Sequence, residues 1–165
     1  MMMGDPPMEP LKINPNFIVA SDHRGFQLKK QLIEWMITKS TWVNLPVIDV
    51  GTFSEDRVDY PDVVASFATA FEQRGIIICG SGFGVSIAAN RYKNIRAVVA
   101  RTGKEVEMAR LHNDANVLCL GADFTNFYTV QNLVAIFMRT KFEGGRHAER
   151  VAKLGEDVST RFNRR

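Results

Sequence analysis

The segment that most constrains the fold of this chain joins a short apolar run to a glycine-rich turn. Residues 75–80 read Gly-Ile-Ile-Ile-Cys-Gly, and residues 80–84 read Gly-Ser-Gly-Phe-Gly. A run of β-branched residues bounded by glycines predicts a strand buried on both faces. The small residues that follow predict the start of a helix. A strand, a glycine turn and a helix N-terminus together favour a bound anion, because backbone N–H groups and the helix dipole point toward it.

Cys79 ends the predicted strand and faces this turn. Ligands of open α/β sheets bind outside the carboxyl ends of the strands. A thiol placed there beside N–H donors is a candidate reactive group, because a positive potential favours the thiolate. The alternative interpretation is that Cys79 is a small buried hydrophobic residue and that the glycines only permit a tight turn.

Length and composition indicate a single soluble domain. The chain has 165 residues, of which 45% are hydrophobic and 24% are charged, and a core of useful size fits within that length. We expect residues 1–15 to form a flexible N-terminal extension without the apolar segment of a signal peptide. Residues 16–160 are expected to form the domain, and residues 161–165 a basic tail.

Several partners are disfavoured by the same composition. The net charge is only +3 and the basic residues are scattered, so no nucleic-acid partner is expected. No apolar run approaches the roughly 18 residues of a spanning helix, so no membrane partner is expected. Two cysteines do not make a disulfide framework, which favours a reducing, cytoplasmic location.

Apolar periodicity predicts five strands that alternate with helices. The strands are expected at residues 17–20, 47–50, 75–79, 97–100 and 116–120. The helices are expected at residues 26–38, 61–72, 85–92, 127–139 and 146–154, with a further helix capped by Thr102. This alternation predicts an α/β fold, a flavodoxin-like or Rossmann-type three-layer sandwich around a five-stranded parallel sheet in the order 2-1-3-4-5.

The predicted order makes the first and third strands neighbours, which places Asp22 and His23 beside Cys79 and Ser81. A carboxylate at a strand's carboxyl end is a candidate proton carrier. The alternative is that Asp22 only caps the following helix.

Two further groups are candidates for binding or proton transfer. His112 and Asn113 lie between a helix and a strand, and a histidine titrates near neutral pH, although a turn on the surface explains them equally well. Arg146 and Arg150 are four residues apart and share a helix face, where an anion would relieve their repulsion. The alternative for this pair is a solvated basic face.

We expect no metal and no cofactor. The three histidines, His23, His112 and His147, are far apart in the sequence and lack the spacing of metal ligands. The alternating glycines at 80, 82 and 84 do not reproduce the G-x-G-x-x-G pattern of a nicotinamide site.

Taken together, these segments resemble ribose-5-phosphate isomerase type B, within the wider sugar-phosphate isomerase family that includes galactose-6-phosphate isomerase. The resemblance runs from about Phe17 to Leu154. It is carried by residues 20–26 (Ala-Ser-Asp-His-Arg-Gly-Phe), 59–61 (Asp-Tyr-Pro), 78–82 (Ile-Cys-Gly-Ser-Gly), 87–90 (Ile-Ala-Ala-Asn), 95–97 (Ile-Arg-Ala), 112–118 (His-Asn-Asp-Ala-Asn-Val-Leu) and 142–147 (Phe-Glu-Gly-Gly-Arg-His).

The resemblance implies an aldose–ketose isomerase of the non-oxidative pentose phosphate pathway, which works through a cis-enediolate without metal or cofactor. Its implied catalytic residues are Cys79 as the base, Asp22 as a proton shuttle between two hydroxyls, Ser81 as a support and His112 as the ring-opening group. Its implied substrate-binding residues are His23, Tyr60, Gly80, Gly82, Phe83, Gly84, Asn113, Arg146 and Arg150.

The same resemblance implies a homodimer with shared active sites, because His112 would come from a neighbouring subunit. The C-terminal helix would take part in dimerisation, and a tetramer of such dimers is left open. One position departs from the family pattern: Asp123 stands where many relatives carry a phosphate-binding arginine. Either other basic groups, such as Arg101, hold the phosphate, or Asp123 turns away from it.

Three other functions compete with this prediction. The nearest is an isomerase of a six-carbon sugar phosphate, such as allose or galactose 6-phosphate. The second is a non-catalytic phosphate-binding module of the same shape. The third is a redox protein that uses Cys79, which is disfavoured because no resolving cysteine lies nearby in the sequence.

Overall fold

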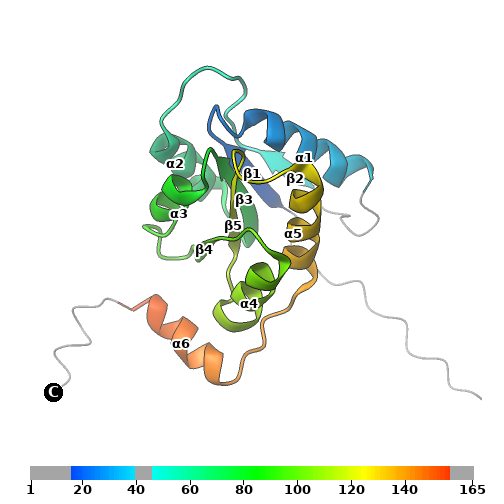
Figure 1. Ribbon diagram of the computed structural model, residues 1–165. Coiled ribbons are helices and arrows are strands. Elements are labelled where there is room, and N and C mark those ends of the chain that lie inside the picture. Colours follow the sequence, from blue (N-terminus) through cyan, green and yellow to red (C-terminus); the bar gives the residue numbers. More distant parts are fainter. Residues whose placement is uncertain (1–15, 40–45, 157–165) are drawn as a thin grey trace, which may run out of the picture.

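A computed structural model of the chain describes residues 16–39 and 46–156. Its five strands form one parallel sheet with helices on both faces (Figure 1). The strands are β1 (Phe17–Ser21), β2 (Val47–Asp49), β3 (Arg74–Cys79), β4 (Ala97–Val99) and β5 (Val117–Gly121). The helices are α1 (Phe26–Thr38), α2 (Tyr60–Ala70), α3 (Phe83–Ala89), α4 (Gly103–Asn113), α5 (Phe127–Arg139) and α6 (Arg146–Leu154).

These elements confirm the predicted α/β sandwich. Helices α1, α5 and α6 have the predicted bounds, and Thr102 caps α4 in a reciprocal capping box with Glu105. Helix α3 begins two residues earlier than expected and ends at Ala89. None of the described helices is long and apolar enough to cross a membrane. The expected extension at 1–15 and tail at 161–165 lie outside the described residues, so the predicted domain limits stay predictions.

The predicted strand order is wrong for the last two strands. The sheet runs β2-β1-β3-β5-β4, so that β5 pairs with β3 and β4 lies at the edge. Strand β5 is buried along its whole length, whereas β4 has three residues and two of them are partly exposed. The longer apolar strand therefore occupies the central position, where neighbours and helices cover it on every side.

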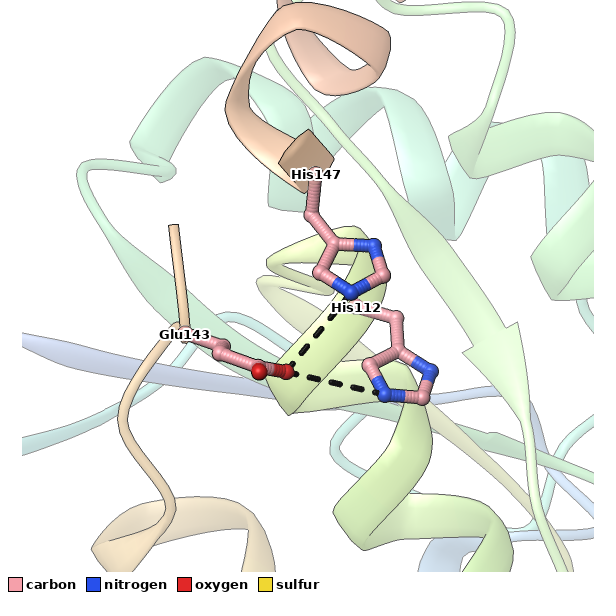
Figure 2. A group of neighbouring side chains, drawn as sticks. All are labelled: His112, Glu143 and His147. Carbon is pink, nitrogen blue, oxygen red and sulfur yellow. Dashed lines mark ion pairs between the residues drawn. The ribbon is translucent and has the colours of Figure 1, made fainter. Parts of the chain in front are cut away.

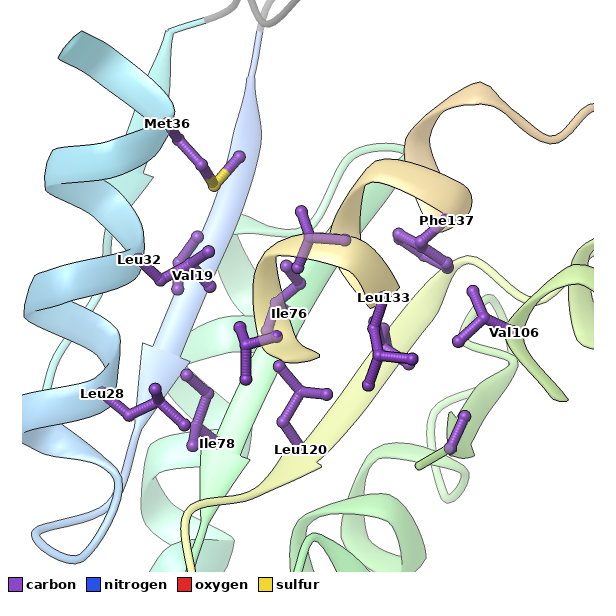
Figure 3. Packing of buried hydrophobic residues seen from close by; sticks show 14 of the residues in the cluster. Val19, Leu28, Leu32, Met36, Ile76, Ile78, Val106, Leu120, Leu133 and Phe137 are labelled. Atoms are coloured by element: carbon purple, nitrogen blue, oxygen red, sulfur yellow. The ribbon is translucent and has the colours of Figure 1, made fainter. Parts of the chain in front are cut away.

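Alternate side chains of the strands pack into two cores on opposite faces of the sheet. One core joins the strands to α1, α4 and α5 and includes Leu32, Ile76 and Leu133 (Figure 3). The other joins them to α2 and α3 and includes Phe67, Ile77 and Cys79. Helix α6 belongs to neither layer: it contacts α4 and lies at the lower end of Figure 1, away from the β2–α2 loop at the top.

A buried lysine ties α1 to the end of β2. The side chain of Lys29 is fully buried, and its Nζ lies 2.6 Å from Oδ1 of Asp49 and also donates to the carbonyl of Thr52. Burial lowers the pKa of Lys29, and the hydrogen bond and charge of Asp49 oppose that shift. The Asp49 carboxylate thus compensates an ammonium that water cannot reach.

We predict that Asp49→Ala lowers the free energy of unfolding by about 3 kcal/mol, because it leaves the Lys29 ammonium buried without its partner. Urea denaturation measures this difference. Glu107→Ala is the matched control, since it breaks the exposed Lys104–Glu107 pair and should leave the midpoint unchanged. Equal midpoints for Asp49→Ala and the wild type would contradict this view of Lys29.

Candidate active site

The carboxyl ends of β1 and β3 bring Asp22 and Cys79 together, as the sequence predicts. Ser21 pairs with Ile78 across the two strands, and the N–H of Asp22 donates to the carbonyl of Ile78 at 3.0 Å. Both side chains are nearly buried, with 6% of Asp22 and 5% of Cys79 exposed. We call these carboxyl ends of the strands, together with His23, Tyr60 and the turn at 80–84, the thiol end.

The glycine turn places one backbone donor against the sulfur and leaves others unused. Gly82 adopts a left-handed conformation with φ of 83°, and its N–H donates to Sγ of Cys79 at 3.1 Å. The N–H of Phe83 donates to Oγ of Ser81 at 3.2 Å. The N–H groups of Gly80 and Ser81 donate to no atom in the described part of the chain. They remain available to an anionic oxygen beside the thiol.

Close packing fixes the shape of this turn. A Cβ atom on Gly121 would lie 2.6 Å from the carbonyl oxygen of Ser81, so the end of β5 presses directly against the turn. A Cβ atom on Gly84 would lie 2.9 Å from the ring of Tyr60. Tyr60 therefore covers one side of the turn, and its contact with a substrate stays a prediction.

The Asp22 carboxylate uses only one of its two oxygens within the described chain. Its Oδ1 accepts the N–H groups of Arg24 at 2.9 Å and of Gly25 at 3.1 Å, which anchors the loop before α1. Its Oδ2 accepts no hydrogen bond within the described residues, and its role in proton transfer stays a prediction. Next to it, His23 accepts the N–H of Val58 on Nδ1 at 3.3 Å.

The departure at Asp123 has a structural explanation. The Asp123 carboxylate forms an ion pair with Arg24, and its N–H donates to the carbonyl of Gly80 at 3.0 Å. The Arg24 guanidinium lies against Gly80, because a Cβ atom there would be 2.7 Å from Cζ of Arg24. Arg24 and Asp123 thus lie beside the turn as an ion pair. Arg24 belongs to the motif at residues 20–26, and the sequence predicts no role for it.

A second arginine lies near the same turn. The Arg101 guanidinium stacks over the ring of Phe124 at 4.5 Å and over the ring of Phe83 at 5.4 Å. Arg101 was the candidate for a replacement phosphate ligand, and these contacts place it beside the turn. Phe83 itself is half exposed at the start of α3, where a ligand could contact it.

The other predicted residues lie at the opposite ends of the strands, where the strands begin. His112 and Asn113 end α4, which runs back to the start of β5. There the carbonyl of Asn116 accepts the N–H of Gly75, at the beginning of β3. Residues 75 to 79 of an extended strand span about 13 Å. One chain therefore does not bring His112 to Cys79. We call the amino ends of the strands, together with α6, the histidine end.

The histidine end contains a compact group of side chains. The rings of His112 and His147 are stacked with their centroids 4.4 Å apart, and the Glu143 carboxylate lies beside both (Figure 2). Burial lowers the pKa of His147, and the nearby His112 and Arg146 add to that shift. Arg146 and Arg150 are exposed and make no ion pair with the described residues.

The fold unites two of the three histidines that sequence spacing had kept apart. The prediction that no metal binds is not tested by this geometry. It was based on the large sequence separation of the histidines, and that separation does not keep His112 and His147 apart in the fold. Glu143 was also missed as a functional candidate. Its only signal in the sequence was its place within the matched segment 142–147.

Comparison with known proteins decides the family. Residues 17–154 match the family model described as Ribose/Galactose Isomerase. The chain belongs to this isomerase family. A Rickettsia bellii protein, which carries only a provisional name as a sugar phosphate isomerase, is 43% identical over 143 residues that cover 84% of this chain and 96% of that protein. The predicted isomerase class is thereby confirmed.

Solved structures of the isomerase family have the same fold. Ribose-5-phosphate isomerase B of Clostridium thermocellum is 38% identical with a TM-score of 0.81, over 89% of this chain and 99% of that chain. Ribose-5-phosphate isomerase B of Mycoplasma genitalium, solved with bound ribulose-5-phosphate, is 36% identical with a TM-score of 0.78, over 86% of this chain and 95% of that chain.

We predict that iodoacetamide modifies Cys79 and spares Cys119. Cys119 is fully buried, and burial together with the neighbouring Cys79 raises the pKa of its thiol. Cys79 instead ends its strand at the glycine turn. Peptide mass spectrometry of the folded protein measures the label, and Cys79→Ala is the control that should take up none. Equal labelling of both cysteines would contradict this difference.

Proposed function

We propose that this enzyme interconverts D-ribose 5-phosphate and D-ribulose 5-phosphate, with Cys79 as the base. The observation that supports this most is the placement of Cys79 and Asp22 at the ends of neighbouring strands, next to a glycine turn with two unused N–H groups. The similarity to a Mycoplasma genitalium structure with bound ribulose-5-phosphate supports the five-carbon substrate.

The proposed reaction moves one proton between two carbons. The Cys79 thiolate takes the proton from C2 of the open-chain aldose, and the electron pair of that C–H bond forms the C1–C2 double bond. The π pair of the C1 carbonyl moves to O1, which gives the cis-enediolate. The thiol then returns a proton to C1, which gives the ketose. Asp22 carries the hydroxyl proton between O2 and O1 through its unused Oδ2.

The N–H groups of the turn stabilise the intermediate. The enediolate places negative charge on an oxygen, and donors already fixed toward that oxygen need no reorganisation during the reaction. Loss of one such donor typically costs about 10²–10³ in rate. In this proposal Gly80 and Ser81 supply the N–H groups, while those of Gly82 and Phe83 hold the sulfur and the Ser81 hydroxyl in place.

We further propose that the residues at the histidine end complete the site of a second copy. His112 would open the furanose ring, Asn113 would contact the sugar, and Arg146 and Arg150 would bind the phosphate together with His23 of the first copy. These roles require hydrogen-bond distances of about 3 Å. Within one chain the length of β3 separates His112 from Cys79, so the site is incomplete without a partner.

A two-fold dimer meets this requirement in both sites at once, because each contact in such an interface occurs twice. Helix α6 stands apart from the sheet layers, and Leu154 on it is 62% exposed. A cavity of about 590 Å³ beside α6 is lined partly by Ile95, Val98 and Val151. These apolar surfaces support a role of α6 in dimerisation, with a second copy as the occupant.

The proposed reaction is tested by conversion of ribose 5-phosphate in the presence of EDTA. We expect the wild type to be active and Cys79→Ala to lose about 10²–10⁴ in kcat, the usual contribution of a positioned base. Cys119→Ala is the matched control, and we expect it to keep wild-type kcat because the Cys119 side chain is fully buried in the core and cannot contact a substrate.

Each other outcome would revise a different part of the proposal. Full activity of Cys79→Ala would move the base to another residue. A clear preference for allose or galactose 6-phosphate would replace the five-carbon substrate. No activity on any of these sugars would leave only the phosphate-binding module.

We predict that the active species is at least a dimer. Sedimentation at the protein concentration of the assay should show no monomer that carries activity, because a lone chain lacks the ring-opening and phosphate groups at its thiol end. An active monomer in the sedimentation profile would contradict the shared site.

A further inference from the structure

Three metal-ligand side chains converge at the histidine end from three different segments. His112 comes from the last turn of α4, Glu143 from the connection between α5 and α6, and His147 from the first turn of α6 (Figure 2). Oε2 of Glu143 lies 3.8 Å from Nε2 of His112 and 3.6 Å from Nε2 of His147. One ligand atom from each residue lies within 4.8 Å of the other two.

The backbone holds this arrangement in place. The N–H of Glu143 donates to the carbonyl of Leu111 at 3.1 Å, which fixes the connection against the end of α4. The N–H of His147 donates to the carbonyl of Gly144 at 3.0 Å. The three side chains therefore meet because of the path of the main chain around the end of α4.

An unpartnered atom points to a missing ligand. The side chain of His147 is 8% exposed, and its Nε2 is buried without a hydrogen-bond partner in the described part of the chain. A buried polar atom normally has a partner, and an exception calls for an explanation such as an ion. In Figure 2 this nitrogen faces the Glu143 carboxylate, which is an acceptor in its ionised form and a natural second ligand.

We propose that His112, Glu143 and His147 form a binding site for a divalent transition-metal ion of the Zn²⁺ class. Two imidazole nitrogens and a carboxylate oxygen are a common three-residue ligand set for zinc, which keeps its fourth position for water or another ligand. Zinc bonds of 2.0–2.1 Å in a tetrahedron place neighbouring ligand atoms about 3.3 Å apart. The observed separations of 3.6 and 3.8 Å are close to this value, and the partly exposed His112 ring has to turn out of its stack on His147 so that both in-plane lone pairs point at the ion.

The expected consequence is inhibition, and this part of the inference rests on the proposed function. A metal ion on Nε2 of His112 occupies the lone pair that ring opening needs. The ion would thus block the group that this chain contributes to its partner, while the thiol end stays unchanged. The metal is an inhibitor in this account, and the isomerase reaction takes place without it.

Binding of Zn²⁺ to the full chain, measured by equilibrium dialysis, tests the site without reference to activity. We expect one ion per chain in the wild type and at least about tenfold weaker binding in Glu143→Gln, which removes the anionic ligand and keeps the side-chain shape. Glu149→Gln on the exposed face of α6 and Cys79→Ser are controls that should bind as the wild type does. Glu143 is exposed, so Glu143→Gln should keep the fold, and circular dichroism checks this.

Three results would overturn the site. They are the absence of binding up to millimolar Zn²⁺, binding that Cys79→Ser abolishes, and binding that Glu143→Gln leaves unchanged. Inhibition is measured separately: Zn²⁺ should lower turnover, EDTA should restore it, and Glu143→Gln should need about tenfold more Zn²⁺. Zn²⁺ that binds with no effect on turnover would reject the inhibitory role, whereas a protein that binds Zn²⁺ and shows no isomerase activity would reject only the proposed function.

Discussion

The close approach of β3 and β5 at their carboxyl ends is the constraint on which the thiol end depends. The N–H of Ala122 donates to the carbonyl of Cys79 at 2.8 Å, and Gly121 leaves no room for a side chain beside Ser81. This contact sets the path of the glycine turn and hence the direction of its N–H groups. It also brings Asp123 to Gly80, so that the ion pair with Arg24 closes the same side of the turn. A central apolar pair of strands thus positions the polar groups at their ends.

The parallel sheet also explains why the remaining groups lie elsewhere. In a β–α–β unit each helix runs back to the start of the next strand, so its last turn lies near the amino ends of the parallel strands. His112 and Asn113 occupy that position on α4, and α6 begins close to them. Residues that would serve one reaction are therefore placed at two ends of the chain by its topology. A second copy is the simplest way to join them, and the exposed Leu154 and the cavity beside α6 lie where such a copy could bind.

Local signals predicted the elements well, because apolar periodicity, Thr102 and the glycine turn act within a few residues. The proximity of Asp22 and Cys79 was also predictable, since it depends only on β1 being next to β3. The central position of β5 was not, because it depends on how completely competing strands are buried. The Arg24–Asp123 pair, 99 residues apart, and the group around Glu143 follow from that placement and from the path of α6. No local pattern encodes such contacts, and the family resemblance named only some of their residues.

The central claim is that each active site combines the thiol end of one chain with the histidine end of another. Subunit mixing tests it most directly: Cys79→Ala and His112→Ala proteins are unfolded together, refolded as a mixture and assayed on ribose 5-phosphate. Each protein alone should be nearly inactive, and in a random mixture half of the dimers contain one site free of both substitutions. The account predicts recovery of about a quarter of wild-type turnover. A mixture no more active than its two parents would contradict it.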